Sequence, residues 1–265
     1  MNEAAPQPTG AREAQLLEAA NLLMDARRNS APIDDLPQPL RPATLEEAYW
    51  IQDQLALVYG EVAGWKIGAP SADATPLFAP MPLIWLGASA TPSPQAQQRF
   101  RGIEAEVAFL LADDLPPRAT PYTRDEVYAA VASCHPAIEL LESAFHDPTD
   151  AAAVSRLSQF ADLQMHGGFI FGPPCPEWRD LDFTREHVTL AIDGSVRLER
   201  TGSNTAGDLR RLLPWLANQG AARTGGLRAG QWITTGSWTG CTRVMAGSTT
   251  DVQFSTLGRV NLRFP

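Results

Sequence analysis

From Gly60 to the C-terminus, the apolar residues of this chain lie in short runs that glycine and proline separate. Runs such as GWKIG, PLIWLG and IEAEVAFLL are too short for buried helices and are typical of strands bounded by turns. The segment HVTLAIDGSVRLER predicts a hairpin that turns at Asp193 and Gly194, and GGFIFG, QWITTGSW and RVNLRF predict further strands. We therefore expect an α+β fold with a β-rich domain over residues 61–265.

The chain before this domain has the pattern of helices instead of strands. Apolar residues recur at helical spacing between Ala11 and Arg28, and arginines end that segment, where the helix dipole favours cations. Thr44 and Glu47 form the T-x-x-E pattern of a capping box, which predicts the start of a second helix. We expect a small helical region over residues 11–60, which follows a flexible tail of residues 1–10.

Two segments of the β-rich domain are also candidates for helices. Thr123 and Glu126 repeat the capping-box pattern and predict a helix over residues 124–134, and the composition of residues 208–223 predicts another. The apolar run HPAIELLES is compatible with a strand or a helix, because periodicity does not separate the two over so short a run.

The charge balance limits the partners of this chain. Its 21 basic and 30 acidic residues give a net charge of −9, which argues against nucleic acid or an anionic membrane surface. No apolar stretch approaches the roughly 18 residues that cross a bilayer, and the N-terminus lacks the pattern of a secretory signal. The 3 cysteines are far apart and form no C-x-x-C pair. We expect a soluble, cytoplasmic protein without a nucleic-acid or membrane partner.

The most informative local motif is the pair of glutamates in IEAEVAF. Residues two apart in a strand face the same side, so Glu104 and Glu106 project together. Two carboxylates side by side repel each other, and burying them unpaired is costly unless a divalent cation neutralises them. Carboxylate oxygens suit Mg²⁺ or Mn²⁺, so the pair is a candidate metal site. The alternative is a strand whose acidic face is exposed to solvent.

Two further charged residues lie among apolar neighbours. In a strand, Glu139 would need a partner or a metal, whereas in a helix it would lie on the surface. Lys66 lies between Trp65 and Ile67, and burial would lower its pKa toward values useful in acid–base chemistry. The alternative for Lys66 is a side chain that extends from a strand end into solvent.

Ser237 and His166 complete the set of candidate residues. The segment GSWTG differs from the G-x-S-x-G of a nucleophile elbow, and a turn with hydroxyl hydrogen bonds explains it better. The 4 histidines lack metal-ligand spacing, and His166, in QMHGG, is the one candidate for a site role. Since the chain has neither G-x-G-x-x-G nor a Walker A motif, no nucleotide cofactor is indicated.

Taken in order, several segments resemble the 2-keto-4-pentenoate hydratase and 4-oxalocrotonate decarboxylase branch of the fumarylacetoacetate hydrolase superfamily. They cover most of residues 44–264, and no single motif is decisive, whereas the ordered set is specific. These segments are TLEEAYWIQDQ, GWKIG, IEAEVAF, PAIELLES, FADLQMHGGFIFG, WLANQGAARTGGLRAGQWITTGSWTG and AGSTTDVQFSTLGRVNLRF.

The resemblance implies a fold and a ligand set. The fold is a β-rich, mixed-sheet roll similar to the C-terminal domain of fumarylacetoacetase, with the small helical region packed on it and HPAIELLES as a strand. The cofactor is Mg²⁺ or Mn²⁺, held by Glu104, Glu106 and Glu139. Lys66 is then beside the substrate, and Ser237 is in or near the pocket.

Two segments depart from the family's pattern. The family commonly has D-S-R after the third glutamate, where residues 142–144 are E-S-A, and A-D-N where residues 161–163 are A-D-L. The missing arginine and asparagine concern the substrate rather than the metal site. His166 lies in the second altered stretch and is a candidate to compensate.

The resemblance also implies a reaction. It is the metal-dependent addition of water to a 2-hydroxy-2,4-dienoate, which gives a 4-hydroxy-2-oxo acid in the meta-cleavage catabolism of aromatic compounds. Lys66 would transfer a proton and Ser237 would help to orient this small carboxylic acid. The alternatives are a decarboxylase of a vinylogous 2-oxo diacid, an acylpyruvate-type C–C hydrolase and a catalytically silent partner subunit. A homo-oligomer, and a complex with a related decarboxylase or hydratase, are further expectations.

Overall fold

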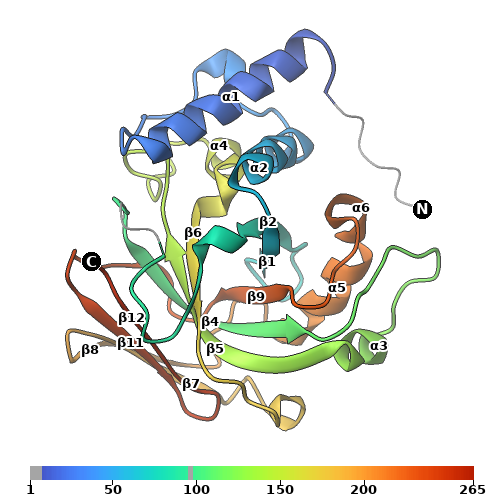
Figure 1. Cartoon of the computed structure of the whole chain (residues 1–265), viewed down its shortest axis with the longest axis vertical. Coiled ribbons are helices and arrows are strands. Elements are labelled where there is room, and N and C mark those ends of the chain that lie inside the picture. Colours follow the sequence, from blue (N-terminus) through green and yellow to red (C-terminus); the bar gives the residue numbers. More distant parts are fainter. Residues whose placement is uncertain (1–7, 95–97) are drawn as a thin grey trace.

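The computed structural model describes residues 8–94 and 98–265. Most of the expected flexible tail, residues 1–7, lies outside the described residues. Two β-sheets form the centre of the fold, and α1, α2 and α4 lie together on one side of them (Figure 1).

The larger sheet is mixed. Its order is β2-β1-β9-β4-β5-β6-β3, and the short strand β10 pairs with β4. The pairs β1/β9 and β3/β6 are parallel, whereas the other pairs are antiparallel. Its strands are β1 Val62–Gly68, β2 Leu77–Pro82, β3 Leu86–Ala88, β4 Gly102–Leu111, β5 Val131–Leu141, β6 His166–Phe171, β9 Trp232–Ser237 and β10 Thr242–Arg243.

The smaller sheet is antiparallel and has the order β12-β11-β7-β8. Asp193 and Gly194 connect β7 to β8 with φ angles of 50° and 76°, which are typical of a type I′ turn, so the predicted hairpin is confirmed. The strands are β7 His187–Ile192, β8 Ser195–Thr201, β11 Thr249–Phe254 and β12 Gly258–Arg263.

The main hydrophobic core lies between the two sheets. Ile103 and Val107 of β4 and Ile138 of β5 pack with Val188 of β7 and Val252 of β11, and all five side chains are buried. Fully burying an aliphatic side chain of this kind stabilises the fold by roughly 1.5–3 kcal/mol. Because side chains alternate along a strand, the opposite face of β4 and β5 is left for other residues.

The helices form two groups. Helices α1, α2 and α4 share a second hydrophobic cluster, in which Leu23, Ile51 and Phe160 are buried, whereas α3 and α5 pack against the main core. The α-helices are α1 Ala11–Arg28, α2 Leu45–Tyr59, α3 Arg124–Ala129, α4 Arg156–Ala161, α5 Leu212–Asn218 and α6 Ala221–Thr224. The 3₁₀ turns are η1 Gln38–Leu40, η2 Leu83–Trp85, η3 Leu163–Met165, η4 Trp178–Asp180 and η5 Leu209–Arg211.

The expected α+β fold with a mixed sheet is confirmed, and two local expectations are wrong. The helix predicted over residues 124–134 ends at Ala129, because the apolar residues from Val131 onward pair with β4 along most of its length. The run PLIWLG is not one strand: its three central residues form the 3₁₀ turn η2, its first residue ends β2 and its last two belong to β3. The boundary between residues 11–60 and 61–265 stays a prediction.

Within the described residues, no helix has both the length and the apolar character that a bilayer crossing requires.

Candidate active site

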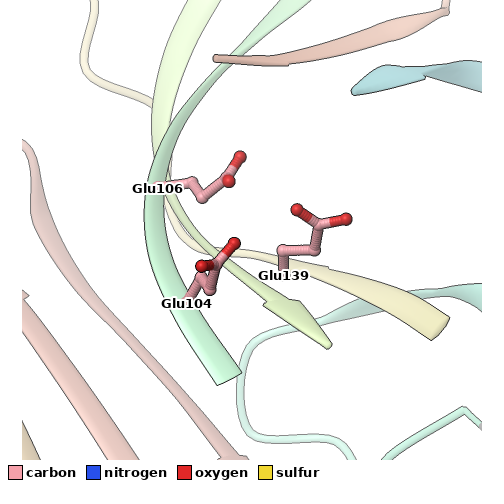
Figure 2. Close-up of side chains that lie close together, drawn as sticks. All are labelled: Glu104, Glu106 and Glu139. Atoms are coloured by element: carbon pink, nitrogen blue, oxygen red, sulfur yellow. The ribbon is translucent and has the colours of Figure 1, made fainter. Parts of the chain in front are cut away.

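Three glutamates converge on the face of β4 and β5 that points away from the main core. Glu104 and Glu106 project from the same side of β4, and the register of the antiparallel pair sets Glu139 of β5 directly opposite Glu104. One carboxylate oxygen from each residue lies within 4.8 Å of the others (Figure 2). Residues 135–141 of the run HPAIELLES thus belong to a strand, and the alternatives of an exposed acidic face or a surface helix are wrong.

The three carboxylates fit a hard divalent cation. Glu106 and Glu139 are buried, with exposed fractions of 1% and 0%, and Glu104 is partly buried. The Oε2 atom of Glu139 is buried and has no hydrogen-bond partner, which is costly for a carboxylate oxygen. A cluster of oxygen ligands with this much negative charge suits Mg²⁺ or Mn²⁺, so these residues could hold one ion.

Because of burial and the charges around them, the three glutamates have different pKa values. Burial, together with the charge of Glu139, raises the pKa of Glu104 to about 7. Burial and both neighbouring carboxylates raise the pKa of Glu106 well above its usual range. Burial also opposes ionisation of Glu139, but Lys66 and a hydrogen bond from His166 outweigh it and lower the pKa to about 2. A cation must therefore displace protons from Glu104 and Glu106 at neutral pH or below.

Lys66 lies beside the three glutamates. Its Nζ atom is 2.7 Å from Oε1 of Glu139, and the side chain is only 11% exposed. Burial lowers the pKa of Lys66, but Glu139, Glu104 and Glu106 reverse the effect, and the net shift is upward. The expectation of a lowered pKa is wrong, as is the alternative of a side chain that extends into solvent. Lys66 is an ammonium in this arrangement.

Strand β9 and the turn after it hold the carboxylates of β4 in place. Thr234 Oγ1 and the backbone N–H of Gly236, 3.2 Å away, both donate to Oε2 of Glu106. The side chain of Ser237 forms a hydrogen bond with Glu104. The Ser237 hydroxyl also accepts the N–H of Gly240 at 2.8 Å, so the turn with hydroxyl hydrogen bonds is confirmed. Thr234 was missed by sequence analysis, since only its register on β9 reveals its role.

His166 lies behind Glu139 and is fully buried. Its Nδ1 atom is 2.8 Å from Oε1 of Glu139, and its Nε2 atom is buried without a hydrogen-bond partner. Burial lowers the pKa of His166 despite the adjacent carboxylate, so the ring is neutral. Among the described residues that line the adjacent cavity, His166 is absent. It therefore contacts the glutamate cluster through Glu139.

A cavity of about 280 Å³ opens from the glutamate cluster toward α4. Lys66, Glu104, Glu106, Glu139 and Ser237 all line it, so the structure brings these five candidates to one place. The volume is close to the lower end of the range for ligand pockets, roughly 300–1,000 Å³. The cavity thus suits a small molecule of a few carbon atoms.

Gln164 is a cavity residue that the sequence analysis missed. Its carbonyl accepts a hydrogen bond from Lys66 Nζ at 3.0 Å. Leu163, Gln164 and Met165 have φ angles of 50°, 53° and 63°, a left-handed conformation that costs about 1–2 kcal/mol for each such residue. No residue in this turn is a glycine, so the sequence contains no signal for it. The turn aims the carbonyl of Gln164 at Lys66.

Arg27 of α1 fixes this left-handed turn from behind. Its guanidinium donates to Oδ1 of Asp162 at 2.6 Å, to the carbonyl of His166 at 2.8 Å and to that of Glu142 at 2.9 Å. Oδ2 of Asp162 accepts from Ser143 and Ala144, so both segments that depart from the family's pattern meet at Asp162. The N-terminal helix therefore supplies a guanidinium to the region where the expected arginine is missing.

The comparisons with known proteins decide the family. No family model matches the chain. The chain is 31% identical to a 2-keto-4-pentenoate hydratase from Burkholderia vietnamiensis over 252 residues, which cover 89% of this chain and 91% of that protein. The chain belongs to the 2-keto-4-pentenoate hydratase family. As a member of this family, it is an enzyme of the lyase type.

Other members and neighbours of the family agree with this assignment. The chain is 28% identical to a 2-oxo-hept-4-ene-1,7-dioate hydratase from Escherichia coli over 164 residues, which cover 61% of each protein. The fold is similar to that of 4-oxalocrotonate decarboxylase from Pseudomonas putida G7 complexed with magnesium and adipate, with a TM-score of 0.81 and 23% identity. That alignment covers 98% of this chain and 100% of the decarboxylase, so the two proteins share their fold over nearly the whole chain.

Proposed function

We propose that this chain is a hydratase that adds water to a 2-hydroxy-2,4-dienoate, giving a 4-hydroxy-2-oxo acid in aromatic meta-cleavage catabolism. The observation that supports the proposal most strongly is the convergence of Glu104, Glu106 and Glu139 beside Lys66 at the buried end of a small cavity. The names of its relatives, which include two hydratases of such acids, support the same reaction class.

The three glutamates would hold Mg²⁺ or Mn²⁺. A divalent cation at this position supplies Lewis-acid stabilisation for the negative charge that develops on a 2-oxo acid during enolisation. The Oε2 atom of Glu139, which is buried without a hydrogen-bond partner, is the ligand atom that gains most from a cation. Because Thr234 and Gly236 already orient Glu106, little reorganisation of that side chain is needed.

Lys66 is the proposed proton-transfer residue. As an ammonium that lines the cavity, Lys66 can donate a proton to C5 of the dienol while the 2-hydroxyl gives up its own proton, which converts the substrate to the conjugated 2-oxo-3-enoate. Water then adds its hydroxyl at C4, and C3 takes up the proton that the water molecule releases. The carbonyl of Gln164 and Oε1 of Glu139 hold the amine in place between these steps.

Ser237 and His166 have supporting roles in this proposal. Ser237 lines the cavity and would help to orient the substrate. His166 is a positioning residue, since its Nδ1 donates to Glu139 and its ring does not line the cavity among the described residues. The altered segments, residues 142–144 and 161–163, are not among the described residues that line the cavity.

Decarboxylation of a vinylogous 2-oxo diacid is the second candidate reaction, because the same cluster would stabilise the same kind of enolate. The two reactions differ in their products, since one releases CO₂ and the other consumes water. Both differ from the silent-subunit alternative, which needs no metal. A cytoplasmic location and assembly into a homo-oligomer belong to the same proposal and rest on the resemblance to the family.

The direct test is an assay of the purified protein with 2-hydroxypenta-2,4-dienoate and Mg²⁺ or Mn²⁺. We expect the diene absorbance to disappear without CO₂ release, and we expect Glu106→Gln to abolish both turnover and tight binding of Mg²⁺. Unchanged diene absorbance with folded, metal-loaded protein would refute this substrate class. Tight Mg²⁺ binding that is the same in Glu106→Gln would refute the metal site itself.

A further inference from the structure

An arginine without a partner lies at the outer end of the cavity. Arg156, the first residue of α4, is exposed and lines the same cavity as the glutamate cluster. Within the described part of the chain, its guanidinium has no hydrogen bond and no carboxylate within 4.0 Å. Its charge is therefore available to a ligand.

The backbone that carries Arg156 is held firmly. Ser155 caps α4 by accepting the N–H of Ser158 at 3.1 Å, and its own N–H donates to Asp35 at 3.1 Å. Phe160 is buried in the helical cluster, and its carbonyl accepts a hydrogen bond from Gln52. Arg156 is thus an exposed side chain that lines the cavity from a firmly held helix.

Apart from five charged residues, the described lining of the cavity is uncharged. Ile67, Ala69 and Leu77 line it, and the charged lining residues that the structure describes are Lys66, the three glutamates and Arg156. The cavity therefore combines buried carboxylates that could hold a metal ion, an uncharged lining and one exposed cation. A guanidinium is a planar fork that matches a carboxylate.

We propose that this pocket prefers a 2-oxo acid that carries a second carboxylate at its far end, and that Arg156 binds this second carboxylate. The inference rests on the proposed function, which assigns the first carboxylate and the 2-oxygen to the buried end. Arg156 is then a specificity-determining residue. The names of the relatives leave the choice open, since one is a hydratase of a monocarboxylate and another of a dicarboxylate.

Two unreactive ligands of equal length separate the dicarboxylate from the monocarboxylate. 2-Oxoadipate and 2-oxohexanoate differ only in the terminal carboxylate, and their affinities for the full chain can be measured by calorimetry with saturating Mg²⁺. We expect 2-oxoadipate to bind about five- to tenfold more tightly, and Arg156→Gln to remove this difference without changing the affinity for 2-oxohexanoate.

Control variants separate a specific contact from a general effect of charge. Arg197→Gln removes the same charge from β8 in the smaller sheet, where Arg197 is exposed, and should leave both affinities unchanged. Arg156→Lys should retain part of the preference for 2-oxoadipate, because the positive charge remains while the planar guanidinium, with its two parallel hydrogen bonds, is lost. Thermal unfolding of each variant checks that α4 is intact.

Equal affinities in the wild-type protein would overturn the inference, and so would a loss in Arg156→Gln that is the same for both ligands. In these cases only the role proposed for Arg156 is refuted, and the proposed metal site is unaffected. If neither ligand binds to folded, Mg²⁺-loaded protein, the proposed function fails and the inference falls with it.

Discussion

Replacing Arg27 with methionine should destabilise the whole protein, although Arg27 lies outside the cavity. Its side chain is 5% exposed and that of Asp162 is 0% exposed, so the two form a buried ion pair. Methionine fills a similar volume but leaves a buried carboxylate without its counter-ion. Three backbone carbonyls, of Glu142, Asp162 and His166, lose a donor as well.

The size of the effect follows from this geometry. Removing one partner of a buried ion pair costs about 3–5 kcal/mol, because the remaining charge is left uncompensated. Burial already raises the pKa of Asp162, and Arg27 opposes that rise. Without Arg27 the carboxyl group should take up a proton more readily, so the loss of stability should be smaller at pH 5 than at pH 8.

Urea unfolding followed by tryptophan fluorescence and circular dichroism measures this loss. Arg28→Met is the matched control, since Arg28 is the next residue of α1 and is exposed, and its free energy of unfolding should stay within about 0.5 kcal/mol of the wild type. Asp162→Asn combined with Arg27→Met should recover part of the stability. A loss below about 1 kcal/mol for Arg27→Met, or one equal to that of Arg28→Met, would refute this account.

Two further predictions concern the residues of the active site. Lys66→Met should lower kcat by about 10²–10⁴-fold. The affinity for Mg²⁺, measured by calorimetry, should be retained or increased, because an ammonium no longer competes for Glu139. Loss of Mg²⁺ binding would contradict the role assigned to Lys66. In metal-free protein, Glu104 has a pKa of about 7 when folded and about 4.3 when unfolded, so its stabilising effect is present below the unfolded value and is lost as the pH rises through 7. The fall in unfolding free energy between pH 5 and 8 should therefore be smaller in Glu104→Gln and with saturating Mg²⁺. If the wild type and Glu104→Gln lose the same unfolding free energy over this pH range in EDTA, the result would count against the raised pKa.

The sequence alone predicted the class of fold and the identity of the metal-binding candidates. Alternation along β4 is a local property, so the common side of Glu104 and Glu106 could be read directly from their spacing. Local signals also located α1, the caps at Thr44 and Thr123 and the turn at Asp193. Each of these depends on residues a few positions apart.

Local signals failed where distant pairing overrode them. The capping box at Thr123 correctly starts α3, yet the helix stops at Ala129 because β5 gains more from its ladder with β4 than from another helical turn. The pKa of Lys66 was misjudged for a similar reason. Burial could be expected from its neighbours, but the three carboxylates that raise the pKa come from other strands.

Only the tertiary structure decided how the site is assembled. The register of β4 against β5 sets Glu139 opposite Glu104, and a shift by one residue would turn Glu139 toward the hydrophobic core. The left-handed turn at Gln164 is held by Arg27, which is 135 positions from Asp162 in the sequence. Side-chain spacing determines which residues share a face, whereas the pairing of distant strands and the burial of charge determine which faces meet.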